Sequence, residues 1–137
     1  MNLYILDACA LLAVLAMENG ANNIRDLFQK AVDNHAVLMM NKINFLEVYY
    51  KIYKTYGKIE ADNLFSTMEQ MPITILDTLS NETFKEAGRL KSKYKLSIAD
   101  SIAVAESITK DGSLVTADHH EIGPIKITEN INVTWFR

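Results

Sequence analysis

Four acidic residues lie in apolar surroundings at well-separated points of the chain: Asp7, Glu47, Asp100 and Asp118. Carboxylates set close together in an apolar framework repel one another unless a cation or a proton compensates their charge. Carboxylate oxygens, with water completing the shell, are ligands that suit Mg²⁺ and Mn²⁺. If the fold brings the four acids together, the sequence predicts a site for one of these cations, and with it metal-assisted chemistry such as hydrolysis.

Three of the four acids also have an ordinary structural interpretation. Asp7 directly precedes an apolar, helix-like run, where Asp is a favoured N-cap. Asp100 lies three residues after Ser97, in the form of a capping box, although Glu or Gln is usual at that position. Asp118 follows a strand-like run, where a turn-forming Asp is common. Capping and cation binding are compatible, because a carboxylate at a helix N-terminus stays ionised.

Glu47 is different, because it lies in the middle of a predicted helix. That helix carries an apolar stripe beside Glu47, made of Ile43, Leu46, Tyr50 and Tyr53. Burying an unpaired carboxylate there would cost several kcal/mol. Glu47 therefore either pairs with Lys51 one turn later or reaches a cation, and the sequence leaves both interpretations open.

The elements that must position these acids alternate along the chain. Short apolar runs predict strands at 2–6, 36–40, 73–76, 113–117 and 125–127, with 133–136 as an edge strand. Helical periodicity predicts helices at 8–17, 21–34, 43–56, 58–70, 81–94 and 97–109. This alternation indicates a parallel sheet covered on both faces. Because strand ends and helix starts meet at one edge of such a sheet, we expect the four acids to converge there.

Length and composition indicate one globular domain over residues 1–137. The chain is 49% hydrophobic and 23% charged, and it has no repeat or linker-like segment. Its longest apolar run is bracketed by Asp7 and Glu18, too short for a membrane span, and no Lys or Arg precedes it as in a secretory signal. The single cysteine, Cys9, excludes an internal disulfide. We expect a cytoplasmic protein.

The net charge of −3 at first argues against a nucleic-acid partner. A cluster of acids would dominate that sum, however, and a bound dication would invert the local potential. Basic residues are gathered at Lys85, Arg89, Lys91, Lys93 and Lys95, and at Lys51, Lys54 and Lys58. These groups are either solvated helix faces or a rim that binds a phosphate backbone, and the sequence leaves this choice open.

Four segments in this order, Ile5–Leu12, Asn44–Val48, Leu96–Asp100 and Val115–Asp118, resemble the PIN-domain nucleases. The resemblance runs essentially end to end. It is strongest to the small single-domain PIN proteins that act as toxins in VapBC-type toxin–antitoxin pairs. It implies a three-layer α/β/α fold whose central, mainly parallel sheet has four to five strands.

The resemblance also implies residue roles. Asp7, Glu47, Asp100 and Asp118 match the family's acidic quartet, which binds Mg²⁺ or Mn²⁺ and cleaves RNA with an activated water. Thr116, Cys9 and Ser97 are expected to support the site, Thr116 as the hydroxyl residue that accompanies the fourth acid. Cys9 stands where the family often has Ser, Thr or Asn. The chain departs from the family again after Asp118, where His119-His120-Glu121 replaces a second acid and an aromatic.

We therefore expect a Mg²⁺- or Mn²⁺-dependent endoribonuclease, the toxin of a toxin–antitoxin pair, with RNA as substrate and an antitoxin as partner. A homodimer is also expected, with segments 49–56 and 58–70 as candidate interface. Two alternatives remain: an RNA-processing nuclease outside any toxin system, and a partner-binding module with little catalysis. Paired histidines could cleave RNA without metal, but the adjacent His119 and His120 seldom reach both ends of a scissile bond.

Overall fold

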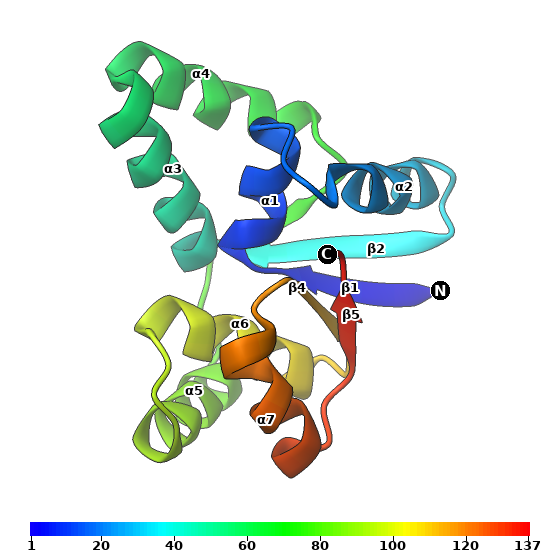
Figure 1. The fold of residues 1–137 in the computed structure, drawn as a ribbon, viewed down its shortest axis with the longest axis vertical. Coiled ribbons are helices and arrows are strands. Elements are labelled where there is room, and N and C mark those ends of the chain that lie inside the picture. The colour runs from blue at the N-terminus through cyan, green and yellow to red at the C-terminus, as the bar shows by residue number, and fades with distance from the viewer.

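The computed structural model describes residues 1–137 as three layers around a five-stranded sheet (Figure 1). The strands are β1 (Asn2–Leu6), β2 (Ala36–Asn41), β3 (Thr74–Leu76), β4 (Ser113–Thr116) and β5 (Val133–Trp135). Their spatial order is β3-β2-β1-β4-β5, and every neighbouring pair is parallel. The predicted α/β class and parallel sheet are confirmed, and the segment 133–136 does supply an edge strand.

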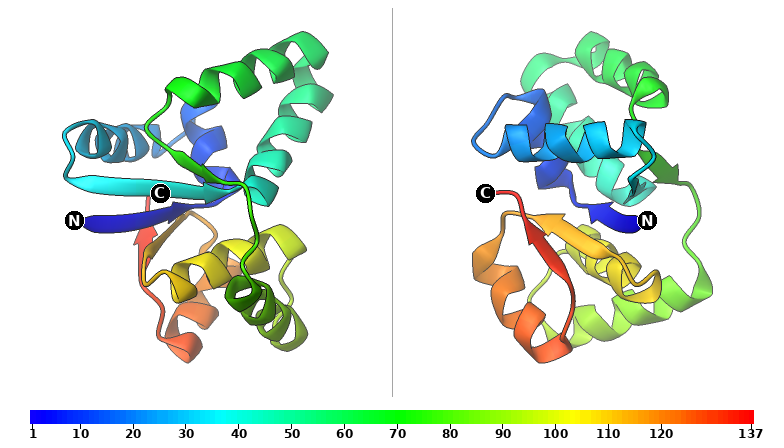
Figure 2. Two further views of the ribbon diagram at one scale, coloured as in Figure 1. Left: turned by 180° about the vertical axis from the view of Figure 1, so that it is seen from behind. Right: turned by 90° about the vertical axis from the view of Figure 1, so that its right-hand side faces the viewer.

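Seven helices lie on the two sides of this sheet (Figures 1 and 2). One side carries α1 (Ala8–Leu15), α2 (Ala21–Val32), α3 (Lys42–Tyr56) and α4 (Lys58–Thr67), the last followed by a 3₁₀ turn at Met68–Gln70. The other side carries α5 (Asn81–Lys93), α6 (Ile98–Thr109) and α7 (His119–Glu129). Each side has its own buried apolar cluster, so the sheet separates two cores. None of these helices has the length and apolar character to cross a bilayer.

Residues 125–127 do not form the predicted strand, because they lie within α7. Ile122 and Ile125, one helical turn apart, are buried in the core shared with α5 and α6, whereas Ile127 is 83% exposed. The apolar-polar-apolar run 125–127 therefore imitates strand alternation, while burial follows the helical spacing. Short apolar runs of this kind do not distinguish the two structures by periodicity alone.

The apolar stripe predicted on the helix 43–56 is on α3 but is not part of the core. Its members are all exposed: Ile43, Leu46, Tyr50 and Tyr53. The buried face of α3 consists instead of Asn44, Phe45 and Val48, which turn toward α1, α4 and α6. Both faces of α3 are apolar, so the sequence pattern gives the helix but not the side that is covered. The α3–α4 hairpin extends away from the sheet (Figure 1).

The order of the strands indicates at which edge of the sheet a ligand would bind. From β1 the chain proceeds outward to β2 and β3, then crosses to β4 and β5 on the other side of β1. In a doubly wound sheet, ligands bind beyond the carboxyl ends of the strands at this reversal. Asp7 directly follows β1, and Asp118 lies two residues after β4. The neighbouring strands β1 and β4 thus bring together two acids separated by more than a hundred residues of chain.

Candidate active site

A cleft of about 350 Å³ opens at this reversal point, and we call it the acidic cleft. The structure brings all four predicted acids to it. Its lining also contains Thr116 and Cys9 of the predicted supporting residues, and Arg137 from the far end of the sequence. Ser97 does not line the cleft. It contacts Asp100, which does, through a hydrogen bond with the Asp100 amide.

Asp7 is both the N-cap of α1 and a wall of the acidic cleft. Its Oδ1 accepts a hydrogen bond of 2.9 Å from the Ala10 amide, and the residue is only 7% exposed. The pKa of Asp7 is raised to about 7, mainly by burial. The Thr116 hydroxyl and the Ala10 amide oppose this rise, and the charges of Asp100 and Glu47 contribute to it. The capping interpretation of Asp7 is therefore correct without excluding a role in the cleft.

Asp100 is held in place by the helix start that the sequence predicted. The Ser97 hydroxyl caps α6 by accepting a bond of 3.0 Å from the Asp100 amide. Burial raises the pKa of the Asp100 carboxyl, and the charges of Glu47, Glu121 and Asp118 raise it as well, against the Ser97 hydroxyl, which lowers it. Asp100 thus lies where the negative potential of acids from two other elements meets.

Asp118 begins α7, a helix that the sequence did not predict. Its Oδ1 accepts a bond of 3.1 Å from the Glu121 amide, and its own amide donates to the buried Thr116 hydroxyl at 3.2 Å. Thr116 therefore supports the site by fixing the turn from β4 into α7. The Asp118 hydrogen bond uses Oδ1 and leaves Oδ2 for a ligand.

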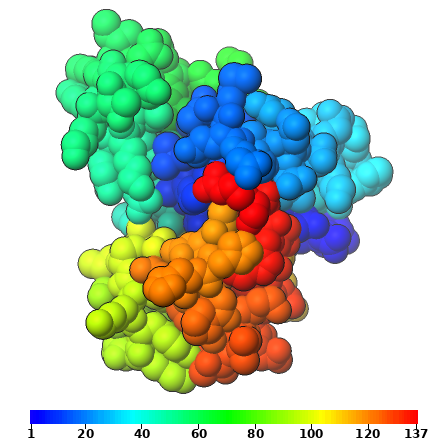
Figure 3. Space-filling model, in the orientation of Figure 1, coloured from blue at the N-terminus to red at the C-terminus, as the bar shows by residue number.

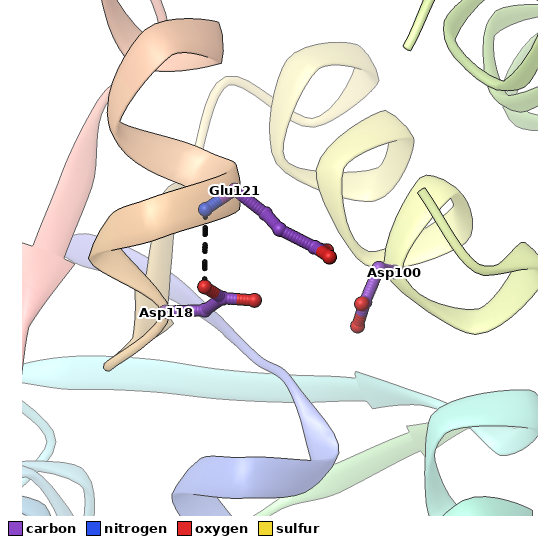
Figure 4. Close-up of side chains that lie close together, drawn as sticks. All are labelled: Asp100, Asp118 and Glu121. Carbon is purple, nitrogen blue, oxygen red and sulfur yellow. Dashed lines mark hydrogen bonds between the residues drawn. The ribbon is translucent and has the colours of Figure 1, made fainter. Parts of the chain in front are cut away.

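Three carboxylates form the tightest acidic group in the molecule. Asp100, Asp118 and Glu121 each offer one oxygen, and these oxygens lie within 4.8 Å of one another. Figure 4 shows the side chains of Asp118 and Glu121 directed from α7 toward Asp100 on α6. An all-oxygen donor set at this spacing fits a hard divalent cation such as Mg²⁺ or Mn²⁺.

Glu47 forms the ion pair that was one interpretation of the sequence, and it also lies at the cleft, where the cation interpretation stays a prediction. Its Oε2 forms an ion pair of 3.2 Å with Lys51 one turn later, and the residue still lines the acidic cleft. A pair of this kind at the surface contributes little stability. Its Oε1 has no hydrogen-bond partner within the chain, so Glu47 can contact a ligand without giving up Lys51.

Asn44 connects two of the acids and was not recognised as a site residue from the sequence. It is fully buried on α3, one turn before Glu47, and its Nδ2 donates a bond of 2.9 Å to the carbonyl of Ala99, the residue before Asp100. Its Oδ1 has no hydrogen-bond partner. The side chain therefore fixes the start of α6 against α3.

A PIN-domain sequence profile matches residues 4–122. The chain belongs to the PIN domain family. Solved structures with the same fold include VapBC2 from Rickettsia felis bound to a promoter DNA fragment (TM-score 0.74, 16% identity, covering 97% of this chain and 98% of that one). The DNA-bound VapBC of Salmonella typhimurium is similar over the full length of both chains (TM-score 0.75, 11% identity).

A third similar structure is VapC20 of Mycobacterium tuberculosis, described as a toxin that cleaves the sarcin–ricin loop. It has a TM-score of 0.63 and 12% identity, and the match covers 80% of this chain and 85% of that one. A search of curated proteins gave no match. At these identities the likeness establishes the fold, and residue roles in this PIN domain must be argued from its own side chains.

Cys9 and the histidines of this PIN domain lack the settings of reactive groups. Burial raises the pKa of the Cys9 thiol, the nearby Asp7 charge adds to this, and so the sulfur is not a thiolate nucleophile. His119 stacks on Trp135 with ring centroids 3.9 Å apart, and neither His119 nor His120 lines the acidic cleft. Cleavage by paired histidines is therefore not supported by their placement.

Besides Asn44, two residues near the site were not assigned a role from the sequence. Glu121 lies three residues after Asp118, the spacing that puts two side chains on one side of a helix, but this signal depends on recognising α7. Arg137 has no signal at all, because it is 130 positions from Asp7 and follows a strand at the edge of the sheet. Only the folded chain brings it to the cleft.

Proposed function

We propose that this PIN domain is a Mg²⁺- or Mn²⁺-dependent ribonuclease that hydrolyses phosphodiester bonds of RNA. The observation that carries the proposal is the convergence of carboxylates from separate elements on one cleft, with the pKa values of Asp7 and Asp100 raised and a single lysine paired to the group. Perturbed carboxylates gathered in a cleft are typical of functional sites, whereas structural acids are paired. We further propose that the protein acts in the cytoplasm, as the toxin of a toxin–antitoxin pair.

The residues divide into those that hold the cation and those that place them. Asp7, Asp100, Asp118 and Glu47 would hold it, with Glu121 as a further ligand. When bound, the cation supplies a more acidic water at neutral pH and offsets the charge that develops on the phosphate. Helix caps keep Asp7 and Asp118 in position, since their hydrogen bonds come from the backbone of the helices that they begin. Rigid placement of this kind avoids reorganisation during the reaction.

RNA is the substrate class that fits an open cleft at the edge of a sheet. Single strands and loops expose their backbone and can enter it, whereas the phosphates of a regular duplex are less free to adapt. The RNA-cleaving toxin among the structures with this fold points to the same class of substrate. Water adds across a P–O bond in this reaction, so no redox partner or energy source is required.

An antitoxin partner and a homodimer are proposed from the surface of α3 and α4. This surface exposes the α3 stripe together with Tyr56, Ile59 and Phe65. It also contains a groove of about 380 Å³ lined mainly by Phe45, Leu46, Tyr49 and Phe65. Extended apolar surface on a small protein marks an interaction site. Light scattering of the isolated chain, then of the chain co-expressed with the adjacent reading frame, tests the dimer and the antitoxin in turn.

The proposed activity is tested by cleavage of an end-labelled single-stranded RNA. Wild-type protein with Mn²⁺ is expected to cleave, and EDTA or the substitution Asp100→Asn is expected to stop it. Lys126→Gln is the control, because Lys126 is exposed on α7 and does not line the cleft. Equal cleavage by Asp100→Asn, or full activity in EDTA, would contradict the proposal.

A partner-binding module with little catalysis is the second candidate, and the exposed α3–α4 surface is the observation that favours it. Isothermal titration with Mn²⁺ separates the two, because a pure scaffold would show no binding that depends on Asp100. A housekeeping nuclease would cleave RNA but would not arrest growth on induction. Arrest that is relieved by the adjacent reading frame identifies a toxin.

A further inference from the structure

Arg137 is the only cationic residue among the twelve that line the acidic cleft. Its guanidinium forms no ion pair with Asp7, Glu47, Asp100 or Asp118. The nearest acidic partner is Glu18, outside the cleft, at 4.0 Å and half exposed. An arginine that lies beside several carboxylates without pairing to them retains its capacity to bind an anion.

The chain fixes Arg137 at this position by several contacts of its backbone neighbours. Phe136 is fully buried, its amide donates to the Thr116 carbonyl at 3.2 Å, and its carbonyl accepts from Asn23 Nδ2 at 2.9 Å. His119, stacked on Trp135, forms a hydrogen bond of 2.7 Å with the backbone oxygen of Arg137. Figure 3 shows this end of the chain lying between the segment after α1 and the start of α7.

Gly20 leaves the space through which this segment passes. A Cβ at Gly20 would lie 2.5 Å from the Phe136 carbonyl oxygen and 3.0 Å from the Arg137 Cβ. Gly20 also has a φ of +89°, a conformation that disfavours residues with a side chain. The loop between α1 and α2 therefore packs closely against Phe136 and Arg137, and this packing fixes the position of Arg137.

The guanidinium itself is only partly engaged. Nη1 donates to the Asn19 carbonyl at 3.0 Å, and Nη2 lies 3.7 Å from Cys9 Sγ. These contacts use two of the five N–H donors of arginine, and the side chain is 33% exposed. The remaining donors form a planar fork of the kind that matches a phosphate. Cys9 thereby acquires a role, since its sulfur is a neutral neighbour that adds no negative charge beside Arg137.

We propose that Arg137 binds a phosphate group of the RNA in the acidic cleft and positions it against the carboxylates. The identity of the anion as RNA rests on the proposed function, whereas the capacity to bind a phosphate rests on the placement of Arg137. A fixed cation also lowers the electrostatic cost of bringing a polyanion to a cleft lined by acids.

Cleavage kinetics provide the first test, with wild type, Arg137→Gln, Arg137→Lys and the control Lys126→Gln. Arg137→Gln is expected to reduce kcat/KM by about 10- to 100-fold, mostly through KM, because it removes a charge-assisted hydrogen bond. Arg137→Lys keeps the charge but not the planar fork of donors, and its kcat/KM is expected to lie between those of wild type and Arg137→Gln. Lys126→Gln should stay within about 2-fold of wild type, since a charge outside the cleft contributes weakly.

Binding gives a second readout that does not depend on catalysis. In an Asp100→Asn background, adding Arg137→Gln is expected to weaken binding of a single-stranded RNA. The slope of log Kd against log salt should fall by about 0.7, the value for one neutralised phosphate of a single strand. A purely structural Arg137 would change the melting temperature and leave this slope unaltered.

The two proposals fail in different ways. An unchanged salt slope and KM in a folded Arg137→Gln protein would overturn the role of Arg137 and leave the nuclease intact. Absence of cleavage by the wild type, with the slope still reduced by Arg137→Gln, would overturn the nuclease and keep the phosphate site. Arg137→Met keeps the length of the aliphatic chain but loses the guanidinium, whose Cζ lies 5.2 Å from the centre of the Phe136 ring, and it replaces Arg137→Gln if that variant does not fold.

Discussion

The carboxylates at the two ends of α7 have opposite electrostatic surroundings. At its end, Glu129 is 9% exposed and receives Arg89 at 2.6 Å, the Tyr94 hydroxyl at 2.6 Å and Lys93 at 3.2 Å. Arg89 above all, helped by Tyr94 and Lys93, holds the pKa of Glu129 at about 2. At its start, Asp118 and Glu121 face Asp100, whose pKa is raised, and no cation pairs with these three.

This contrast distinguishes an acid that stabilises the fold through ion pairs from acids that have no such partner. Glu129 joins α7 to α5, and its charge is fully matched by the chain. Asp7 and Asp118 in the cleft are placed by helix caps, and no cation of the chain forms an ion pair with either of them. Arg89 and Lys93 on α5 fall on the first side of this division, because both are engaged with Glu129 rather than offered to a ligand.

The largest difference is expected in activity. Asp7→Asn should lower RNA cleavage by at least about 10³-fold, because it removes a buried ligand whose charge nothing else replaces. Glu129→Gln should stay within about 2-fold, since Glu129 lies at the other end of α7. Cleavage assays on the two variants decide this, and comparable losses in both would remove the distinction.

The pH dependence of stability should differ in sign between Asp7 in the cleft and Glu129 at the end of α7. The native pKa of Asp7, about 7, lies above its unfolded value of 3.8, so its contribution is full below pH 4 and is lost as pH rises through 7. Without metal, the stability advantage of Asp7→Asn over wild type should grow by roughly 2–3 kcal/mol between pH 5 and pH 8. Urea unfolding measures this. A gap that is constant with pH would show that Asp7 is not protonated in the metal-free protein.

Asn44 offers a smaller test of how the cleft is held together. Asn44→Ala removes the bond to the Ala99 carbonyl and should weaken Mn²⁺ binding by about 10-fold, as is typical for residues that orient metal ligands. Thr67→Ala is the control, because its hydroxyl bonds to the Asn63 carbonyl on α4, away from the cleft. Titration calorimetry compares them, and unchanged affinity in Asn44→Ala would mean that Glu47 and Asp100 are placed independently.

The smallest effect should come from the matched end of α7. Glu129→Gln should lower the melting temperature by a few degrees at pH 7, because its partners are partly exposed and ion pairs there contribute modestly. The native pKa of Glu129 lies below its unfolded value of 4.5, so this contribution is present above pH 4.5 and disappears as pH falls through 2. Melting curves at pH 7 and pH 2.5 test it, and a loss as large at pH 2.5 as at pH 7 would contradict the electrostatic explanation.

The sequence predicted the framework of the site because local and global signals agreed. The strands before Asp7 and Asp118 are apolar runs closed by an acid, and parallel strands bring such ends to one edge. Ser97 was recognisable as a cap from its spacing to Asp100 alone. The structure confirms the caps at Asp7 and Ser97 and the Glu47–Lys51 ion pair, while cation binding by Asp7 and Glu47 stays a prediction.

The features that could not be predicted from the sequence depend on long-range packing. The helix α7 was hidden because Pro124 and Gly123 weaken its pattern and Ile125 and Ile127 imitate a strand. The contribution of Glu121 was lost with that helix. The exposed stripe of α3 was misplaced because a helix that is apolar on two faces does not reveal which one is covered. Arg137 reaches the cleft only through tertiary contacts, which no local pattern encodes.

The central claim is that these carboxylates form one cation site. The most direct test is a crystal of the wild-type protein soaked in Mn²⁺, with anomalous scattering used to locate the metal. We predict density in the acidic cleft, within coordination distance of Asp100 and Asp118, and its loss in Asp100→Asn crystals soaked in the same way. A cleft free of anomalous density at saturating Mn²⁺, or density unaffected by Asp100→Asn, would contradict the claim.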